Sequence, residues 1–257
     1  MFTEIEKHEI QCPKRYLEYT ENEYFRALRD KENPNCHEAN YAVIKNLECA
    51  ESTMMRVELF YAGLPIVPKF LYQPDMVPLP VLRPFLENHG YVVKKFHTTR
   101  MLLTAKPSPL LLMSRCGVQC RTMGLTDTER IAINISFGDN GEGLSLIEHR
   151  MAAGARVFVL YTDDGLPVSY CLGEGYGTSF EIANVYTLKD FRRRGYAAKA
   201  VTQAVKYALD IGYTDIFLNA ASSTSQKLFT EMGFTGELVE RFWAFKDELP
   251  QWMMTLK

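Results

Sequence analysis

The sequence predicts an α+β (or α/β) fold in which strands and helices alternate, and three observations support it. The chain has 257 residues, 47% hydrophobic and 23% charged, which is typical of a globular protein and too apolar for a disordered one. Residues 194–211 carry small apolar side chains at the spacing of an amphipathic helix. An order of strand, short helix, Gly-aromatic pair and strand occurs at 69–104 and again at 215–245, which favours two tandem copies.

The first half of the chain contains runs with helical and with strand periodicity. Leu86–Tyr91 superposes on Phe229–Phe234 without a gap, with glycine before the last aromatic residue in both segments. Glycine at this position is typical of a helix end. We therefore expect helices at 21–30, 50–62 and 79–88, and strands at 41–47, 69–72 and 91–104.

The second half has stronger patterns. Ala200, Val201, Ala204 and Val205 lie on one face of the expected long helix, and Gly212 is well placed to end it. The Asp-Gly pair in the segment 163–167 predicts a turn between two strands. We expect helices at 127–135, 145–153, 194–211 and 223–232, and strands at 156–162, 168–172, 179–187, 215–220 and 238–245.

Proline and glycine are distributed unevenly and indicate a domain boundary. Ten of the 12 prolines lie between Pro13 and Pro109, whereas 14 of the 16 glycines follow Arg115. Linkers collect proline and polar residues, so the segment around 107–115 is the expected boundary. The expected domains are 1–112 and 113–257, and the apolar run at 110–113 could pair as a strand with either.

Composition excludes several classes of protein. The formal charge of −2 argues against a general nucleic-acid binder, because phosphate backbones select an excess of Lys and Arg. The six cysteines form no C-x-x-C pair, so neither a disulfide scaffold nor a structural zinc site is expected, and we expect no metal. Residues 1–9 have acids where a signal peptide has bases, and no run of about 18 apolar residues occurs. We therefore expect a cytoplasmic protein without a membrane partner.

The segment Arg192-Arg193-Arg194-Gly195-Tyr196-Ala197 opens the long helix and predicts an anion site. A helix N-terminus presents unpaired backbone N–H groups and partial positive charge. Glycine lets a phosphate approach the backbone closely, and three arginines add charge where a diphosphate would lie. The alternative is a solvated basic turn before a surface helix, which the flanking strand and striped helix disfavour.

The segment resembles the coenzyme-binding motif R/Q-x-x-G-x-G/A of the GCN5-related N-acetyltransferases, matched here by Arg192, Gly195 and Ala197. The resemblance is good over 120–250 and fainter over 20–105, where the motif is missing. It implies a mixed, mostly antiparallel sheet flanked by helices, in two tandem copies with a degenerate first half. It also implies transfer of an acetyl group from acetyl-coenzyme A (acetyl-CoA) to a primary amine, by a monomer or homodimer.

In this family two central strands splay apart around the pantetheine arm of the coenzyme. The resemblance then places the main chain at Val185 and Thr187 against pantetheine, and the turn 192–198 around the pyrophosphate. Asn219, Ser222 and Ser225 would face the arm. The full set of coenzyme-binding residues implied is Val185, Tyr186, Thr187, Arg192, Arg193, Arg194, Gly195, Tyr196, Ala197, Ala198, Asn219, Ser222, Ser225 and Phe229.

Direct attack needs a neutral amine, and only about one alkyl amine in 1,000 is neutral at pH 7. Glu181 is the best candidate for a base, acting through water, and even spacing would place it on one strand face with Ala183 and Val185. The alternative is a surface glutamate, and His149 and Glu174 are further candidates. Phe229 stands where the family often has a tyrosine that protonates the leaving thiolate, and Ser222 where it often has asparagine.

The first half is expected to complete the sheet and wall the acceptor pocket rather than to bind coenzyme. Its polar loop at 32–41 contains Cys36, His37 and Glu38, for which a capped loop is the favoured interpretation. Two other functions stay open for the whole chain. One is a sensor that binds acyl-coenzyme A without turnover, and the other is an interaction protein with an empty site.

Overall fold

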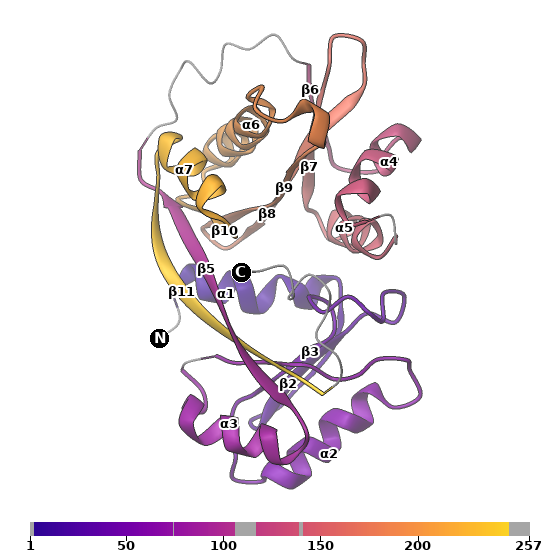
Figure 1. The fold of residues 1–257 in the computed structure, drawn as a ribbon, viewed down its shortest axis with the longest axis vertical. Coiled ribbons are helices and arrows are strands. Elements are labelled where there is room, and N and C mark those ends of the chain that lie inside the picture. The colour runs from indigo at the N-terminus through magenta and orange to yellow at the C-terminus, as the bar shows by residue number, and fades with distance from the viewer. Residues whose placement is uncertain (1–2, 74, 106–116, 139–140, 247–257) are drawn as a thin grey trace. The chain divides into compact units, whose positions relative to one another are not determined.

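The computed structural model describes residues 3–73, 75–105, 117–138 and 141–246, which divide into two compact units. Unit 1 consists of residues 1–16 and 98–239, and unit 2 of residues 17–97 and 240–257. Each unit has a sheet with helices packed on it (Figure 1). The predicted class, a mixed and mostly antiparallel sheet flanked by helices, is confirmed.

The sheet of unit 1 has the strand order β11-β5-β10-β9-β8-β7-β6. The ladders β6–β7, β7–β8, β8–β9 and β5–β10 are antiparallel, whereas β9 and β10 pair in parallel. Its strands are β6 (Val118–Arg121), β7 (Arg156–Tyr161), β8 (Pro167–Tyr176), β9 (Ser179–Thr187), β10 (Asp215–Ala220) and the ends of β5 (Val92–Leu103) and β11 (Phe234–Phe245) that belong to unit 1.

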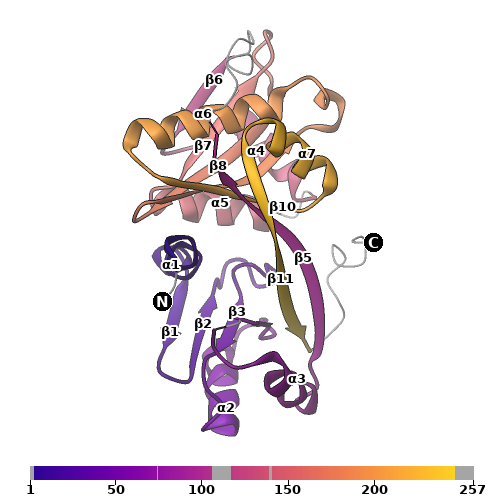
Figure 2. The same ribbon diagram turned by 90° about the vertical axis from the view of Figure 1, so that its left-hand side faces the viewer.

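Helices cover both faces of this sheet (Figure 2). The apolar stripe of α6 (Tyr196–Ile211) is buried against β7, β8 and β9 together with Phe229 of α7 (Ser223–Glu231), as the helical spacing predicted. A second core lies between the other face and the helices α4 (Asp127–Ser136) and α5 (Glu142–Ala152). Helix α1 (Glu4–Gln11) contacts β8, β9 and β10, and the 3-10 helices η1 (Pro13–Arg15) and η3 (Lys189–Phe191) connect elements.

The sheet of unit 2 has the order β1-β2-β3-β4-β11. Helices α2 and α3 pack their buried residues, such as Val57 and Leu86, on buried positions of β2, β3 and β4. The elements are β1 (Glu18–Glu21), β2 (Phe25–Arg29), β3 (Tyr41–Ile44), α2 (Ala50–Tyr61), β4 (Phe70–Leu71) and α3 (Leu79–Asn88).

The expected helix at 21–30 is wrong, because the chain there forms the hairpin β1–β2. The side-chain oxygen of Asn22 accepts the backbone N–H groups of Tyr24 and Phe25 at 2.8 and 3.0 Å, which makes the turn. Four consecutive residues of β2, 25–28, are buried, and so the strand lacks the alternation that distinguishes a strand from a helix. The elements α1, β1, β2 and β6 were not anticipated.

The units differ from the expected halves 1–112 and 113–257. Residues 106–116, which include the expected boundary and the apolar run at 110–113, lie outside the described residues. Thr99–Leu102 of β5 pair with β10, whereas Trp243 and Ala244 of β11 pair with β4, so each sheet takes a strand from the other half of the sequence. No helix among the described residues is long and apolar enough to cross a membrane.

Candidate coenzyme site and buried charge cluster

Strands β9 and β10 pair and then separate. Their parallel ladder joins Asp215–Phe217 to Ser179–Glu181. Beyond it, residues 218–220 of β10 pair with β5, whereas Tyr186 and Thr187 of β9 pair with β8. Glu181 therefore lies at the point where the two strands diverge. This is the splayed geometry that the resemblance implied.

A bulge changes the faces of β9. Asn184 has φ +50°, and the β8–β9 register shifts between Tyr170 and Leu172 opposite it. The extra residue reverses the alternation, so that Ala183 packs on the α4–α5 side and Val185 on the α6 side. The expectation that Glu181, Ala183 and Val185 share one face is therefore wrong at Val185.

The turn that precedes α6 has a backbone shaped for an anion. Gly195 is the N-cap with φ +81°, and Arg193 has φ +61°, so two residues in this turn are left-handed. The first intrahelical bond is from Lys199 N–H to the Gly195 carbonyl oxygen at 3.1 Å. The N–H groups of residues 196–198 thus belong to the helix end that has no intrahelical acceptor. The predicted anion site is geometrically available here.

The three arginines of this turn are exposed, but they are not equivalent. Arg192 donates from Nε to the Thr187 carbonyl oxygen at 3.0 Å and covers the ring of Tyr186. It therefore fastens the turn to the end of β9. Arg194 lies over the ring of Phe191. Arg193 is the arginine that takes the strained conformation, which is typical of functional turns.

The remaining expected coenzyme residues lie on β10 and α7. Asn219 has a buried side-chain oxygen without a hydrogen-bond partner, on the strand that diverges from β9. Ser222 is the N-cap of α7 and forms a capping box with Ser225. Phe229 is 4% exposed and packs in the α6 core, edge-on to Phe234. Asn219 thus offers a buried acceptor without a hydrogen-bond partner, whereas the two serine hydroxyls already bind each other's backbone.

Replacing Ser222 with alanine should lower the free energy of unfolding by about 1 kcal/mol, because one side-chain cap of α7 is lost. Urea denaturation measures this change. Ser223→Ala is the matched control, since Ser223 follows the cap as the first helical residue, and it should leave the midpoint nearly unchanged. Equal effects of the two substitutions would show that the capping box does not stabilise α7.

Glu181 belongs to a buried charge cluster that sequence reasoning did not assemble. Arg150 of α5 donates to Glu181 Oε2 at 3.1 Å and to Glu174 Oε2 through two nitrogens, at 2.9 and 2.7 Å. Burial opposes the charge on Arg150, but Glu174, Tyr16 and Glu181 hold its pKa well above the usual value. Arg150 also reaches Asn184 at 3.5 Å and so links the candidate base to the bulge.

Glu174 was a candidate base, and the structure places it in this cluster, 1% exposed. The other candidate, His149, is the sequence neighbour of Arg150 on α5. Two residues from the N-terminal segment join the cluster and were not anticipated. His8 Nε2 lies 4.0 Å from Glu181 Oε2, and Cys12 lies near Glu174. The capping box of α1, Thr3 with Glu6, is a sequence signal that could have revealed their helix.

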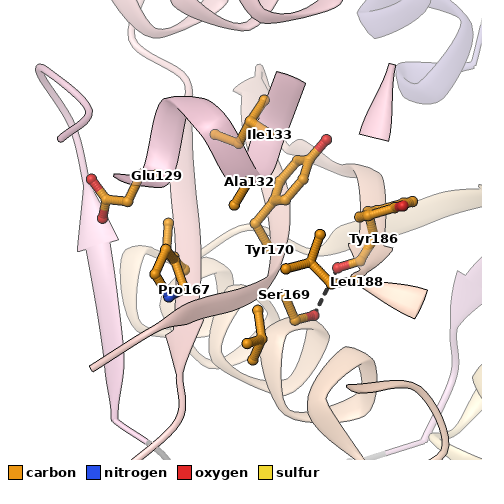
Figure 3. A pocket seen from close by; sticks show the side chains of 10 residues that line it. Glu129, Ala132, Ile133, Pro167, Ser169, Tyr170, Tyr186 and Leu188 are labelled. Atoms are coloured by element: carbon orange, nitrogen blue, oxygen red, sulfur yellow. Dashed lines mark hydrogen bonds between the residues drawn. The ribbon is translucent and has the colours of Figure 1, made fainter. Parts of the chain in front are cut away.

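A small pocket opens beside this region under α4 (Figure 3). It has a volume of about 10 Å³, room for about one water molecule, and is bounded by α4, β7 and the ends of β8 and β9. Tyr170 and Tyr186 line it, and Tyr170 shares a hydrogen bond of 2.5 Å with Ser136 of α4. Ser169 donates to the Tyr186 carbonyl oxygen at 2.7 Å, the bond drawn in Figure 3. The pocket is below the range of about 300–1,000 Å³ of typical ligand sites.

Comparison with known proteins identifies the class of this domain. Residues 131–234 match the model of the Acetyltransferase (GNAT) family, where GNAT stands for GCN5-related N-acetyltransferase. The match runs from α4 to the start of β11 and includes β9, the turn before α6, and α7. The resemblance expected from the sequence is confirmed over residues 131–234, which match the GNAT family. This family transfers acyl groups from acetyl-CoA.

Solved structures show the same fold over almost the whole chain. A GCN5-related N-acetyltransferase from Kribbella flavida is 16% identical, with 94% of each chain covered and a TM-score of 0.65. A putative GNAT-family acetyltransferase from Novosphingobium aromaticivorans is 14% identical, covering 94% of this chain and 96% of its own, with a TM-score of 0.60. A tandem GNAT protein from the clavulanic acid biosynthesis pathway is 10% identical, covering 88% and 79%, with a TM-score of 0.58. A search among curated proteins finds no match.

Proposed function

We propose that this protein is an N-acetyltransferase that moves the acetyl group of acetyl-CoA to a primary amine of a small molecule or peptide. The observation that carries the proposal is the separation of β9 from β10 directly before the left-handed turn at Gly195. The gap would receive the pantetheine arm, and the N-terminus of α6 would receive the pyrophosphate. The partners are then acetyl-CoA and an amine acceptor, with neither nucleic acid nor membrane required.

The proposed contacts of the coenzyme follow from which backbone carbonyl oxygens already accept a hydrogen bond from the protein. Ser169 donates a hydrogen bond to the Tyr186 carbonyl oxygen, and Arg192 donates one to that of Thr187. The main chain of Val185 is therefore the best pantetheine partner on β9. On β10 the unpartnered oxygen of Asn219 can accept an amide N–H of the arm. Arg193 and Arg194 supply charge to the diphosphate, together with the N–H groups of 196–198.

The acceptor amine has to lose a proton before or during direct attack on the thioester. In our proposal a water held by Glu181 takes this proton, since Glu181 lies where the strands diverge and is partly exposed. Its Oε2 already accepts from Arg150, which fixes the carboxylate and leaves Oε1 to contact the water. Arg150 acts as a positioning residue in this scheme. The thiolate of coenzyme A can leave without a protein acid, because a thiol pKa near 8.5 makes it a tolerable leaving group.

Glu181→Gln should lower kcat about 100-fold at pH 7 if Glu181 is the base. The deficit should shrink as the pH approaches 10, because the amine then becomes neutral without help. Thiol release from acetyl-CoA over pH 6–10, with the best amine of a panel, measures both effects. Glu148→Gln is the matched control, since Glu148 lies on α5 in an exposed pair with Arg130. A full rate of Glu181→Gln at pH 7 would exclude the assignment.

A second function, an acyl-coenzyme A sensor without turnover, is favoured by one observation. Phe229 occupies the place of the usual acid and is buried in the core. Two measurements separate the functions. Acetyl-CoA should raise the melting temperature for both, whereas thiol release with an amine panel should occur only for the enzyme. If acetyl-CoA moves neither the melting temperature nor a calorimetric signal, both proposals fail.

Unit 2 retains the proposed role of a degenerate copy that binds no coenzyme. Gly90 follows the end of α3 with φ +82°, and Gly233 follows the end of α7 with φ +100°. The order of helix, glycine and strand thus occurs in both units. Its loop at 32–41 is internally capped, since Asn40 accepts from Asp30 N–H and donates to the Asn33 and Cys36 carbonyl oxygens. These bonds support the structural interpretation of that loop over a catalytic one.

A further inference from the structure

Three side chains of types that can bind a metal lie together in unit 1, close to the candidate base Glu181. His8, Cys12 and Glu174 each offer one ligand atom, and these atoms lie within 4.8 Å of one another. The residues are 1%, 3% and 1% exposed. His8 and Cys12 are four residues apart on and just after α1, so the helix turn places them on one face. Glu174 comes from β8.

The hydrogen bonds around His8 fix which ring nitrogen faces this group. Ser179 Oγ donates to the Tyr176 carbonyl oxygen at 2.8 Å, so it accepts from His8 Nδ1 at 3.0 Å. Burial lowers the pKa of His8, which favours the neutral ring. Its Nε2 therefore carries a lone pair, and it is buried without a hydrogen-bond partner. An orienting bond on the other nitrogen is typical of a metal-binding histidine.

Glu174 presents a second unpartnered acceptor. Both Arg150 bonds go to Oε2, whereas Oε1 is buried and has no hydrogen-bond partner. Cys12 Sγ lies between these elements, and burial raises its pKa to about 12, so the residue is a thiol in the absence of a cation. Two unpartnered buried lone pairs beside a thiol are unfavourable in an apo site, and a metal ion would satisfy them together.

We propose that His8 Nε2, Cys12 Sγ and Glu174 Oε1 bind one Zn²⁺ ion. Nitrogen, sulfur and oxygen ligands in one set are typical of zinc, and the tetrahedral bond lengths need ligand separations of about 3.3–3.7 Å. The ligands must therefore close by about 1 Å, which side-chain rotation can supply. On binding, the Cys12 S–H bond breaks, sulfur bonds the metal, and the proton passes to solvent. A water molecule would complete the tetrahedron. This departs from the expectation of no metal.

The charges around His8, Cys12 and Glu174 influence the affinity of this group for a metal ion. Glu174, Glu181, Arg150 and Arg15 face it, and Glu9 adds a further negative charge that acts on His8. Arg15 Nη1 is 3.8 Å from Cys12 Sγ and 3.9 Å from Glu174 Oε1, so its charge opposes a metal ion. Its side chain is 32% exposed and is held outside the group by the Gly175 and Ala153 carbonyl oxygens. Removing this charge should strengthen metal binding.

The experiment uses the full chain without a histidine tag, freed of metal with a chelator, and Co²⁺ as a spectroscopic probe. We expect one equivalent of Co²⁺ to give a thiolate charge-transfer band in the near ultraviolet and tetrahedral visible bands, and Zn²⁺ to remove both. Zn²⁺ should also raise the melting temperature, because it binds the folded state. Absence of the thiolate band in the wild-type protein at saturating Co²⁺ would overturn the proposal.

Variants assign the ligands independently of acetyl transfer. Cys12→Ser should abolish the thiolate band, whereas Cys120→Ser, which removes an exposed thiol of β6, should keep it. Arg15→Gln should bind Co²⁺ about tenfold more tightly, because a like charge is removed. A band that survives in Cys12→Ser, or an Arg15→Gln affinity equal to or weaker than that of the wild type, would contradict the proposal. Should Cys12→Ser fail to fold by circular dichroism, the Arg15→Gln comparison decides.

Discussion

Gly195→Glu should weaken acetyl-CoA binding by more than about 100-fold, because at least two charge-assisted hydrogen bonds to the pyrophosphate are lost. Two effects combine in this variant. The residue has φ +81°, which residues with a side chain rarely adopt, and the new carboxylate would lie where we propose that the phosphates bind. Space is not the cause, since a Cβ at this position meets nothing within 4 Å. Isothermal titration calorimetry with acetyl-CoA measures the loss.

The matched control is Gly165→Glu in the hairpin between β7 and β8. Gly165 has φ +83° and open space around its Cβ, so a side chain there meets the same backbone strain of about 1–2 kcal/mol at a residue outside the candidate coenzyme site. We expect Gly165→Glu to bind acetyl-CoA normally, and Gly195→Ala to fall between the two glutamate variants. Intact binding by Gly195→Glu would place the pyrophosphate elsewhere and remove the main support for the proposed site.

Arg150→Met should destabilise the fold by about 3–5 kcal/mol, because the buried Glu174 carboxylate loses both bonds from Arg150 and keeps only the more distant contact with Arg15, at 3.9 Å. Arg150 is 8% exposed and Glu174 1% exposed, so solvent cannot replace the lost pair. Chemical denaturation followed by far-ultraviolet circular dichroism measures the change. Adding Glu174→Gln to Arg150→Met should recover part of the stability, since the unpaired charge is then removed.

An exposed arginine on the neighbouring helix is the control for Arg150→Met. Arg130 of α4 pairs with Glu148 at 2.7 Å, but the two side chains are 46% and 32% exposed. Arg130→Met should cost less than about 1 kcal/mol, as is usual for surface ion pairs. A similar small cost for Arg150→Met would mean that the cluster around Glu174 is hydrated or protonated rather than a buried ion pair.

Local pattern predicted most of the second half of the fold. The Ala-Val stripe of α6 occurs where periodicity placed it, because this helix buries one regular face. The strand β9 also occurs where it was expected, because turns bound it. The β1–β2 hairpin was missed, since buried residues 25–28 follow one another and give no alternation. The bulge at Asn184 was missed as well, because one extra residue in a strand leaves no periodic signal before the pairing is known.

The candidate site, like the fold, could be predicted from the sequence only in part. Sequence reasoning found the glycine turn and Glu181, which belong to one continuous segment with a recognisable order of residues. It missed Arg150 and His8 because their roles depend on contacts over long separations, such as His8 with Ser179, 171 residues away. In the sequence, His8 and Cys12 are ordinary residues of an acidic N-terminal segment. Their grouping becomes visible only in the structure, where α1 packs on β8 and β9.

The position of α1 in unit 1 has a consequence for synthesis and for fragments of the chain. Helix α1 is synthesised before the strands on which it packs, and these are completed only after residue 220 has been made. It must therefore wait through most of translation with His8 and Ile10 uncovered, which exposes it to chaperones and proteases. A recombinant fragment of residues 113–257 would lack both α1 and the β5 strand, and we expect it to be poorly soluble. Co-expression with a peptide of residues 1–16 would not supply β5, so the full chain is the smallest sensible unit for expression.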